Sequence, residues 1–495
     1  MNYILSIDQG TTGTTALLIN TQTFAIDHKV NFEFPQHYPK PGWVEHDLDD
    51  IWHSVQMSVK EVLSSSNVDA NHIKCIGITN QRETTCAFDL NGTPLAKAIV
   101  WQDRRTSKFC QSLKDDGVEE LFKSKTGLPL DPYFSGTKIH WLLNNNQLVK
   151  KHSEVKKLRF GTIDTYLLYK LSGQSSFKTD ATNASRTLLM DLETGDWDSE
   201  LLNILGVDQS TLPEICDSFT DYGTTKGLQF LPDGIPITCL LGDQQAALFG
   251  QAGVKKGDMK CTYGTGAFLL LNTGEDIVHS ENGLLTTCAY KHNEQMYYAL
   301  EGSSYIAGAA VQWVRDNLGF IDTSPAIEEL ARTIKNLEEM ENVLFLPFFS
   351  GLGSPYWKPD AKGALIGLTR DTGRSHIARA CLEGICLSIN DIIKAFEQDS
   401  NTKLNSLKVD GGAVANNLLL EMQSTFSNLN IIRPEVIETT AFGAGLGAYI
   451  GSGAVKLDEV MNLWKEDKTF SPLKEKDYFY KKTELWNHVI KKLYL

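Results

Sequence analysis

The stretch YILSIDQGTTGTTALLIN, residues 3–20, predicts two strands joined by a polar turn. Residues 3–7 and 16–19 are rich in β-forming apolar side chains, whereas the turn between them contains Asp, Gln, Gly and Thr. A tight hairpin needs only a short turn such as Asn-Gly or Gly-Gly. This turn therefore carries more acid, amide and hydroxyl groups than a hairpin requires.

The chain repeats this design. The stretch CTYGTGAFLLLN, residues 261–272, again reads as a strand, a turn of Gly and Thr, and an apolar strand. One copy would mean little, because Gly and Thr are common in turns. Two copies, one near the start of each half, indicate two related domains. Since consecutive N–H groups in Gly-rich turns bind anions, two such hairpins facing each other across a cleft could hold a polyanion from both sides.

A third Gly-rich turn lies in LKVDGGAVANN, residues 407–417, where an apolar strand runs into Gly411 and Gly412. We expect a helix to begin near Ala413, and a helix N-terminus favours negative charge. Tight packing explains a Gly-Gly turn equally well. Neither the P-loop pattern G-x-x-x-x-G-K-[ST] nor a G-x-G-x-x-G after a strand occurs in the sequence. A phosphate site would therefore be assembled from two hairpins.

Composition limits the class of protein. A chain of 495 residues predicts two or more domains. The net charge of -14 argues against a nucleic-acid surface, which is usually basic. No stretch reaches the roughly 18 apolar residues of a membrane span and no leader pattern follows Met1, so we expect a cytoplasmic protein without a membrane span. The nine cysteines form no C-x-x-C pair, and we interpret them as reduced, mostly buried thiols.

Strand-like and helical patterns alternate along the chain. Residues 73–80 and 84–92 predict strands, and residues 49–63 and 375–396 have helical periodicity. The C-terminal stretch FYKKTELWNHVIKKLYL predicts an amphipathic helix packed on the surface. This alternation indicates an α/β fold.

A series of motifs extends from Asp8 to about Gly447: IDQGTTGTT, ITNQRETT, WQDRR, GDQQAALFG, YGTGAF, LEGSSYIAGAAVQW, GLGSPYWKPDAKG and VDGGAVANN. The series resembles the FGGY carbohydrate kinases of the actin/hexokinase/chaperone-ATPase superfamily, and among them the members that phosphorylate glycerol. YFSGTKIHWLLNN and GALIGLTRDTGRSHIARACLE are similar to the two signatures of the family. The resemblance implies an α/β fold of two ribonuclease-H-like (actin-like ATPase) domains, residues 1–250 and 251–495, flanking a deep catalytic cleft.

The same resemblance implies a nucleotide site shared by both domains. Asp8 would be a catalytic residue that holds Mg²⁺, a hard cation suited to carboxylate and water ligands, near the phosphates of ATP. The residues implied in nucleotide binding are Thr11, Thr12, Gly13, Thr265, Gly266, Gly308, Gln312, Gly412 and Asn416. The two hairpins would contact the phosphates from opposite sides, and Gly412 with Asn416 would bind the adenosine.

A general base and a polyol pocket are also implied. Asp243 follows the apolar run ITCLL and precedes a helix, where an isolated Asp would usually be an N-cap. By resemblance it is the catalytic base that accepts the proton of the attacking hydroxyl. The residues implied in hydrogen bonding to glycerol are Arg82, Glu83, Tyr133, Asp243 and Gln244, and those implied as apolar walls are Trp101 and Phe268.

The implied activity is phosphorylation of glycerol by ATP to sn-glycerol 3-phosphate, with ADP as co-product. Thr15 departs from the family, because it stands where these kinases usually carry an Arg, and loss of that cation weakens phosphate binding. Two alternatives stay open. One is an FGGY kinase of another small polyol or sugar. The other is a nucleotide-binding pseudokinase, which Thr15 favours and the retained Asp8 and Asp243 oppose.

The implied partners are glycerol, ATP and further copies of the chain in a homodimer or homotetramer. Because the implied groups come from both halves, we expect glycerol and nucleotide together to close the cleft about a hinge near LFGQAGVKKGDMK, residues 248–260. Closure would exclude water, which could otherwise accept the phosphoryl group.

Overall fold

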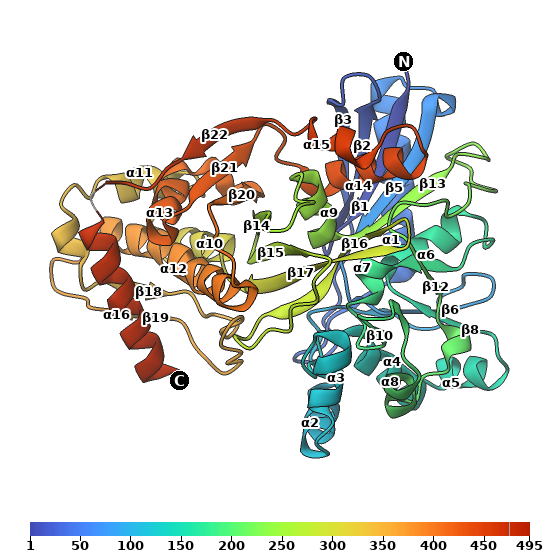
Figure 1. Ribbon diagram of the computed structural model, residues 1–495, viewed down its shortest axis with the longest axis horizontal. Helices are drawn as coiled ribbons and strands as arrows, with labels where there is room; N and C mark the ends of the chain where they lie inside the picture. The colour runs from blue at the N-terminus through green and yellow to red at the C-terminus, as the bar shows by residue number, and fades with distance from the viewer. Residues whose placement is uncertain (475) are drawn as a thin grey trace.

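The hairpin of residues 3–20 lies in the middle of a five-stranded sheet in the computed structural model, which describes residues 1–474 and 476–495 (Figure 1). Its two strands pair antiparallel, with Asp8 opposite Thr15. On the other side of β1, strands β5 and β13 run parallel to it. The order across the sheet is β13 (Ile237–Gly242), β5 (Ile73–Asn80), β1 (Tyr3–Gln9), β2 (Gly13–Asn20) and β3 (Ile26–Glu33).

Both faces of β1 and β2 in this sheet are buried, which explains why the opening strand is apolar at successive positions. Leu5 and Ile7 pack in one apolar cluster with α1 (Leu48–Ser66). Ile4, whose side chain points the other way, packs in a second cluster with α14 (Thr439–Gly451). The predicted strand at residues 73–80 and helix at residues 49–63 are confirmed as β5 and α1.

A second sheet of seven strands repeats the connections of the first. β14 and β15 form the second predicted hairpin, β17 pairs antiparallel with β15, and β20 and β21 continue the sheet parallel to β14. β1, β2, β3, β5 and β13 have this same arrangement, so the predicted pair of related α/β domains is confirmed. The order is β16 (Leu285–His292), β17 (Gln295–Ser304), β15 (Ala267–Gly274), β14 (Met259–Tyr263), β20 (Ser406–Asp410), β21 (Asn430–Pro434) and β22 (Glu466–Phe470).

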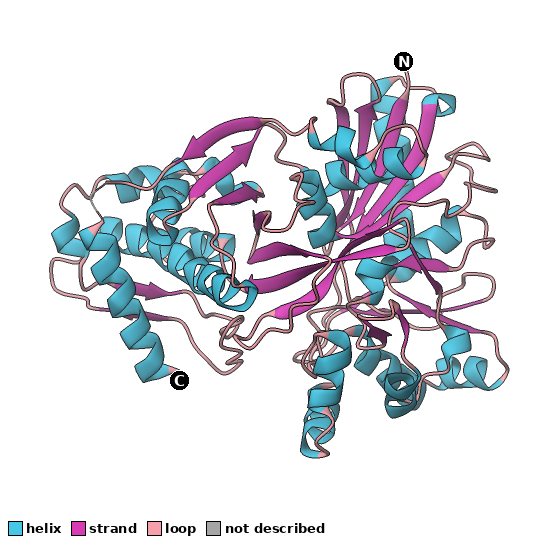
Figure 2. Cartoon of the chain, viewed as in Figure 1, coloured by secondary structure: helices cyan, strands magenta, loops and turns pink. Residues whose placement is uncertain are grey.

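Helices cover the second sheet and form the core of its lobe, as the cyan ribbons beside the magenta strands in Figure 2 show. The helix predicted at residues 375–396 is confirmed as α12. The predicted amphipathic C-terminal helix, α16, buries Trp486 against Phe348, and the Trp486 indole N–H donates to Asp391. These helices are α10 (Gly308–Asp316), α11 (Ala326–Arg332), α12 (Arg374–Ser400), α13 (Asn417–Ser427) and α16 (Asp477–Leu493).

Two helices lie side by side where the lobes join (Figure 1). Helix α9 (Asp243–Gly250) follows β13 and leads through residues 251–258 to β14, while α14 comes from the C-terminal half and covers the first sheet. A Cβ atom at Gly250 would lie 2.1 Å from the carbonyl oxygen of Thr439, and one at Gly443 would lie 2.0 Å from that of Ala246. Glycine therefore permits the backbones of the two helices to touch.

Smaller elements complete both lobes, and most of them lie between β5 and β13 in the chain. They are β4 (Glu45–His46), β6 (Cys86–Asp89), β7 (Ala98–Ile99), α2 (Ser107–Asp115), α3 (Glu119–Thr126), α4 (Ser135–Asn145), α5 (Gln147–Glu154), β8 (Leu158–Gly161), α6 (Ile163–Leu171), β9 (Lys178–Asp180), α7 (Ala181–Ala184), β10 (Met190–Asp191), β11 (Asp196–Trp197), α8 (Ser199–Leu205), β12 (Glu214–Cys216), β18 (Leu344–Leu346), β19 (Ala364–Ile366) and α15 (Leu457–Met461). Among the described residues, no helix is long and apolar enough to cross a membrane. All nine cysteines are free, and all except Cys216 are buried, as expected.

Candidate active site

The parallel strands of the first sheet place four predicted residues at one edge. Asp8 lies near the carboxyl end of β1, Arg82 and Glu83 follow β5, and Asp243 follows β13 directly. Because these three strands run parallel, their carboxyl ends meet at the same edge, which is where open α/β sheets bind ligands. Residues far apart in the sequence are thereby brought to one place.

A cleft of about 1470 Å³ opens at this edge and is lined from both lobes. The predicted residues that line it are Thr11, Thr12, Arg82, Glu83, Trp101, Tyr133, Asp243, Gln244, Thr265, Gly266 and Phe268. The predicted residues outside this lining are Asp8, Gly13, Gly308, Gln312, Gly412 and Asn416. The cleft thus gathers every residue predicted for the polyol pocket, together with Thr11 and Thr12 of the first hairpin and Thr265 and Gly266 of the second.

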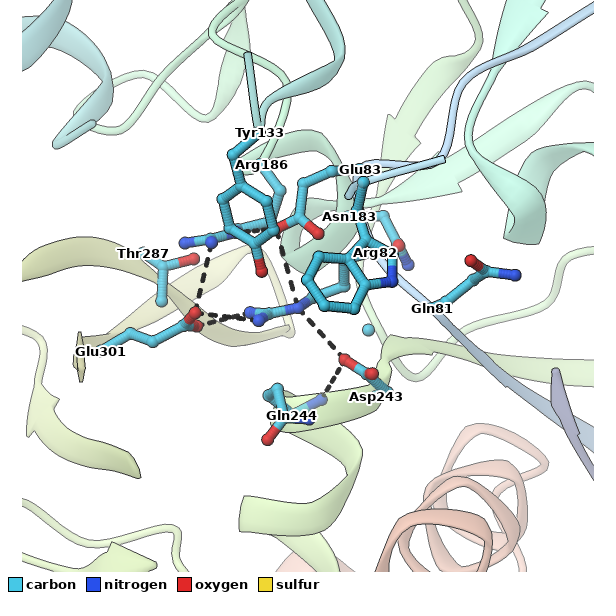
Figure 3. A network of polar contacts seen from close by, with 12 residues as sticks. Gln81, Arg82, Glu83, Tyr133, Asn183, Arg186, Asp243, Gln244, Thr287 and Glu301 are labelled. Carbon is cyan, nitrogen blue, oxygen red and sulfur yellow. Dashed lines mark hydrogen bonds and ion pairs between the residues drawn. The ribbon is translucent and has the colours of Figure 1, made fainter. Parts of the chain in front are cut away.

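Arg82 and Glu83 belong to a buried group of four charged side chains, here called the Arg–Glu network, together with Arg186 and Glu301 (Figure 3). Arg82 Nη1 and Nη2 lie 2.5 and 2.9 Å from the two carboxylate oxygens of Glu301. Arg186 donates from Nε to Glu83 at 2.6 Å and from Nη2 to Glu301 at 3.2 Å. Glu301 comes from β17 of the second sheet, so the network joins the two lobes.

The charges of the Arg–Glu network balance one another in a dry environment. All four side chains are at most 2% exposed. Burial alone would raise the pKa of Glu301, but Arg186 and Arg82 outweigh it and lower this pKa to about 2. Removing one partner of such a buried pair typically costs about 3–5 kcal/mol, because the other charge is left uncompensated. Glu301 is therefore ionised at physiological pH, whereas burial raises the pKa of Glu83 although Arg186 and Arg82 act against it.

Glu83 has an unusual backbone conformation for a buried, non-glycine residue. Its φ is 59°, and the Thr84 N–H donates to the Arg82 carbonyl oxygen at 2.7 Å, which closes a three-residue turn around it. Turns of this kind with a positive central φ are rare and strained. The Ser135 hydroxyl and the Lys138 ammonium both donate to the Glu83 carbonyl oxygen, at 3.0 and 3.3 Å. Tertiary contacts therefore hold this turn in place.

Aromatic side chains from both lobes form one wall of the cleft. The Trp101 ring meets Tyr133 and Phe268 edge to face, with centroids 5.7 and 6.4 Å away. Phe268 lies on β15 of the second lobe, whereas the other two belong to the first. The Trp101 indole N–H donates to the Thr11 hydroxyl at 3.0 Å, so this wall is bonded directly to the turn of the first hairpin.

Asp243 lies at the start of α9 and faces the cleft, but it is not the N-cap. Gly242 occupies the cap position and Asp243 is the first helical residue, so the N-cap prediction is wrong by one residue. One carboxylate oxygen of Asp243 accepts the Gln244 N–H at 2.7 Å and lies 3.2 Å from Arg82 Nε. Burial raises the pKa of Asp243, although Arg82 and Lys260 act against it, and the side chain remains 29% exposed. It is thus an accessible carboxylate with increased basicity.

The two hairpin turns are fixed by backbone bonds. The Gly10 N–H donates to the Gly13 carbonyl oxygen at 2.9 Å, and Gly264 donates to Gly266 in the same way at 2.9 Å. Helix α10 starts against the second turn, where Gly308 N–H donates to the Gly264 carbonyl oxygen at 3.0 Å. Gln312 follows one turn later on the same helix. The Ala307 and Ala309 N–H groups likewise donate to the Thr265 carbonyl oxygen, so the start of α10 is bonded to the second turn and holds it in place.

The turn after β20 packs directly on the strand of the second hairpin. Gly411 has a φ of 89°, and a Cβ there would lie 2.5 Å from the Tyr263 carbonyl oxygen, so glycine is required. A Cβ at Gly412 would meet nothing within 4 Å, which leaves open space beside it. The helix predicted near Ala413 begins later: residues 412–415 form a 3₁₀ turn, and Asn416 caps α13 by accepting the Leu419 N–H.

Burial, and to a smaller extent the charges of Asp243 and Glu438, raise the pKa of Asp8 to about 7. Among the described residues no group of three or more His, Cys, Asp or Glu side chains could hold a metal ion. Mg²⁺ does not need such a group, because it keeps several waters and takes one or two carboxylates together with substrate phosphates. The buried carboxylate of Asp8, whose pKa the nearby charge of Asp243 raises further, fits such a site.

Thr15 contacts an uncharged side chain, and a cation lies on the neighbouring strand. Its hydroxyl accepts from the Asn31 side-chain amide at 3.0 Å. Lys29, two residues before Asn31 on β3, forms an ion pair with Glu438, and its charge lowers the pKa of Asp8 against the dominant effect of burial. Lys29 is therefore a positive charge close to the position where Thr15 lacks one.

Sequence reasoning missed Arg186, Glu301 and Lys260. Glu301 is the acid in the otherwise apolar run YYALEG, and a buried acid nearly always has a charged partner, so this signal was available. Lys260 likewise interrupts an apolar strand, and its ammonium donates to Gln244 and, at 2.9 Å, to Thr262. No comparable local signal marks Arg186, which follows the short helix α7.

Comparisons with known proteins agree with this architecture. The family model for the N-terminal domain of the FGGY family of carbohydrate kinases matches residues 3–250, and the model for the C-terminal domain matches residues 259–451. Glycerol kinase of Bdellovibrio bacteriovorus is 49% identical over 472 residues, covering 95% of this chain and 94% of that protein. Glycerol kinase of Myxococcus xanthus is 47% identical over 494 residues, or 99% of each. The crystal structure of Plasmodium falciparum glycerol kinase with ADP superimposes with a TM-score of 0.92 at 37% identity, covering 100% of this chain and 99% of that one.

Proposed function

This chain belongs to the FGGY family of carbohydrate kinases, and we propose that it transfers the γ-phosphoryl group of ATP to glycerol, giving sn-glycerol 3-phosphate and ADP. The observation that carries the proposal is the pocket around Asp243. Charged and hydroxyl groups of Arg82, Glu83 and Tyr133 converge there beside an aromatic wall. A small polyol needs such an arrangement, because its hydroxyls must exchange water for protein partners on nearly every side.

Asp243 is the proposed general base. It accepts the proton of the attacking hydroxyl while that oxygen forms a bond to the γ-phosphorus of ATP. The bond between the γ-phosphorus and its bridging oxygen breaks, and ADP leaves with that oxygen. The raised pKa and partial exposure of Asp243 support this assignment, because a base must be both accessible and basic enough to take the proton.

The two hairpins are the proposed phosphate contacts. Thr11, Thr12 and Gly13 would donate from the first lobe, and Thr265 with Gly266 from the second. Helix α10, with Gly308 and Gln312, and the turn containing Gly412 and Asn416 would hold the rest of the nucleotide. The open space beside Gly412 supports an adenosine site there. Phosphoryl transfer asks mainly for such positioning and charge stabilisation.

Asp8 is the proposed ligand of Mg²⁺, with water completing the coordination. Mg²⁺ would neutralise the charge that builds up on the phosphates. The mutual repulsion of Asp8 and Asp243 supports a cation at this place, since it raises the pKa of Asp8 in the absence of one.

Several expectations stay predictions. These are the homodimer or homotetramer, the cytoplasmic location, the division of the chain into residues 1–250 and 251–495, and the hinge at residues 248–260. Light scattering coupled to size-exclusion chromatography measures the first of these directly.

The proposal is tested by the release of ADP in a coupled assay, with and without glycerol and across a panel of polyols and sugars. We expect ADP release to depend on glycerol, with kcat/KM highest for glycerol and the product oxidised by an enzyme specific for sn-glycerol 3-phosphate. A pocket built to bond hydroxyls rejects analogues that lack one. A higher kcat/KM for a pentose or hexulose would favour another FGGY kinase, and no turnover with any acceptor would favour a pseudokinase.

A further inference from the structure

The two residues that we propose to bind the polyol most directly lie on a segment of backbone that regular secondary structure does not hold in place. Arg82 and Glu83 follow the end of β5, outside the hydrogen-bonded ladder of the sheet. Glu83 has a positive φ in a strained three-residue turn. A side chain on such a turn keeps one orientation only when its surroundings impose it, because the backbone alone does not.

Glu301 imposes the orientation of Arg82. Its two oxygens accept from both terminal nitrogens of the guanidinium, at 2.5 and 2.9 Å, and this paired geometry fixes the plane of the group. Gln245 accepts a further bond from Nη1 at 3.2 Å. The remaining edge of the guanidinium, Nε, lies 3.2 Å from the Asp243 carboxylate and has no hydrogen-bond partner among the described residues. Arg82 is therefore held through its two terminal nitrogens, and its Nε edge faces the proposed base, Asp243.

Arg186 fixes the orientation of the Glu83 side chain. Its Nε donates to one carboxylate oxygen of Glu83 at 2.6 Å, and its Nη2 donates to Glu301 at 3.2 Å. The guanidinium of Arg186 also lies 5.5 and 5.2 Å from the ring centroids of Tyr133 and Phe134. One fully buried Arg thus ties together Glu83, the aromatic wall and Glu301 from the second lobe (Figure 3).

We propose that Glu301 and Arg186 are positioning residues for the polyol: they hold Arg82 and Glu83 in the orientation that receives the glycerol hydroxyls, and through Glu301 the second lobe takes part in forming the pocket. This inference rests on the proposed function. Neither residue contacts the substrate in this account, and both act through the pair that does. A purely structural ion cluster would stabilise the fold without affecting glycerol more than ATP.

The test compares Glu301→Gln with a matched control. Glutamine keeps the size of the side chain, but its amide nitrogen would face an N–H of Arg82, so one arm of the paired bond is lost. A displacement of the reacting groups by about 1 Å can cost about 10²-fold, and we expect kcat/KM for glycerol to fall by about this factor while the KM for ATP stays within about threefold. Glu301→Asp, which keeps the charge on a shorter arm, should recover part of the loss.

The control is Glu383→Gln in α12. Glu383 is also 1% exposed and paired with an Arg, with Arg379 Nε at 3.0 Å, but it lies outside the lining of the cleft. We expect it to lower the melting temperature without changing the ratio of the two KM values. If Glu301→Gln changes stability and both KM values no differently from Glu383→Gln, the positioning role is refuted.

Arg186→Lys keeps the test decisive if Glu301→Gln does not fold. Lysine preserves the positive charge but offers a single nitrogen, which cannot reach Glu83 and Glu301 in the paired manner. We expect a loss specific to glycerol again, and an unchanged KM for glycerol in a folded Arg186→Lys variant would overturn the proposal. The unmodified protein is assayed alongside. If it does not phosphorylate glycerol, the proposed function is refuted. If it does, but the variants affect the KM values for glycerol and ATP equally, only the positioning role is refuted.

Discussion

Replacing Asp243 by Asn removes the proposed proton acceptor and little else. Asn is similar in size, and its side-chain oxygen can still accept the Gln244 N–H that Asp243 accepts at 2.7 Å. It has no charge and cannot take a proton from the attacking hydroxyl. General base catalysis contributes about 10²–10⁴-fold, so we expect kcat to fall by that factor, equivalent to about 2.7–5.4 kcal/mol at 1.36 kcal/mol per tenfold change.

The fold should tolerate this replacement. Arg82 keeps its paired bonds to Glu301, and its contact with Asp243 is a single one at 3.2 Å to a partly exposed side chain. Burial raises the pKa of Asp243, which means that the folded state disfavours its negative charge. The neutral Asn removes that unfavourable term, so the melting temperature should stay the same or rise slightly. A loss of kcat could then not be attributed to unfolding.

The assay is steady-state ADP release at saturating glycerol and ATP, together with the KM for ATP and the melting temperature with and without ADP. We expect the nucleotide constants to remain near those of the unmodified protein, because the proposed nucleotide contacts lie mainly in the hairpin turns and the second lobe. A variant that retains kcat within about threefold would refute the role of Asp243 as the base, since no proton acceptor would have been lost.

The other predictions concern the polyol pocket, the cations near the phosphates and closure of the cleft. Arg82→Ala and Glu83→Ala should each raise the KM for glycerol by about 10–100-fold and change the KM for ATP less, since hydrogen bonds to charged groups are worth about 1.5–3 kcal/mol. A change in the KM for ATP alone would show that the residue does not belong to the polyol pocket. Lys29→Ala should raise the KM for ATP by about 3–10-fold and Thr15→Arg should lower it, because each changes a cation near the phosphates; unchanged values would show that neither position contacts the nucleotide. Glycerol with a non-hydrolysable ATP analogue should reduce the radius of gyration in small-angle scattering, because groups from both lobes must approach the reactants, whereas an unchanged radius would indicate a cleft that is already closed.

The fold could be predicted from the sequence because the central strands of its two sheets are buried on both faces. Continuous apolar strands such as residues 3–7 and the repeated hairpins are local signals, and the structure confirms both. The helix after Gly412 was placed too early, although Asn416 was a recognisable N-cap in the sequence. At Asp243 the N-cap rule failed because Gly242 already closes the strand, so the acid is the first residue of the helix.

The Arg–Glu network could not be predicted because its contacts are long-range. Arg82 and Glu301 are 219 residues apart in the chain, and Glu83 and Arg186 are 103 apart. Which buried acid meets which buried base depends on how the two sheets are joined, and no local pattern contains that information. The residues predicted for the polyol pocket all line the cleft, and the structure adds Arg186 and Glu301, which contact Arg82 and Glu83.

Phosphorus-31 NMR of the protein with ATP, Mg²⁺ and glycerol follows the proposed transfer of the γ-phosphoryl group from ATP to a glycerol hydroxyl. We predict that the γ-phosphate signal of ATP decreases while the signals of ADP and of a single phosphomonoester increase in equal amounts. The phosphomonoester signal should be coupled to the protons of a glycerol CH₂ group, and inorganic phosphate should not build up. Formation of inorganic phosphate in place of the ester, or an unchanged ATP spectrum, would contradict it.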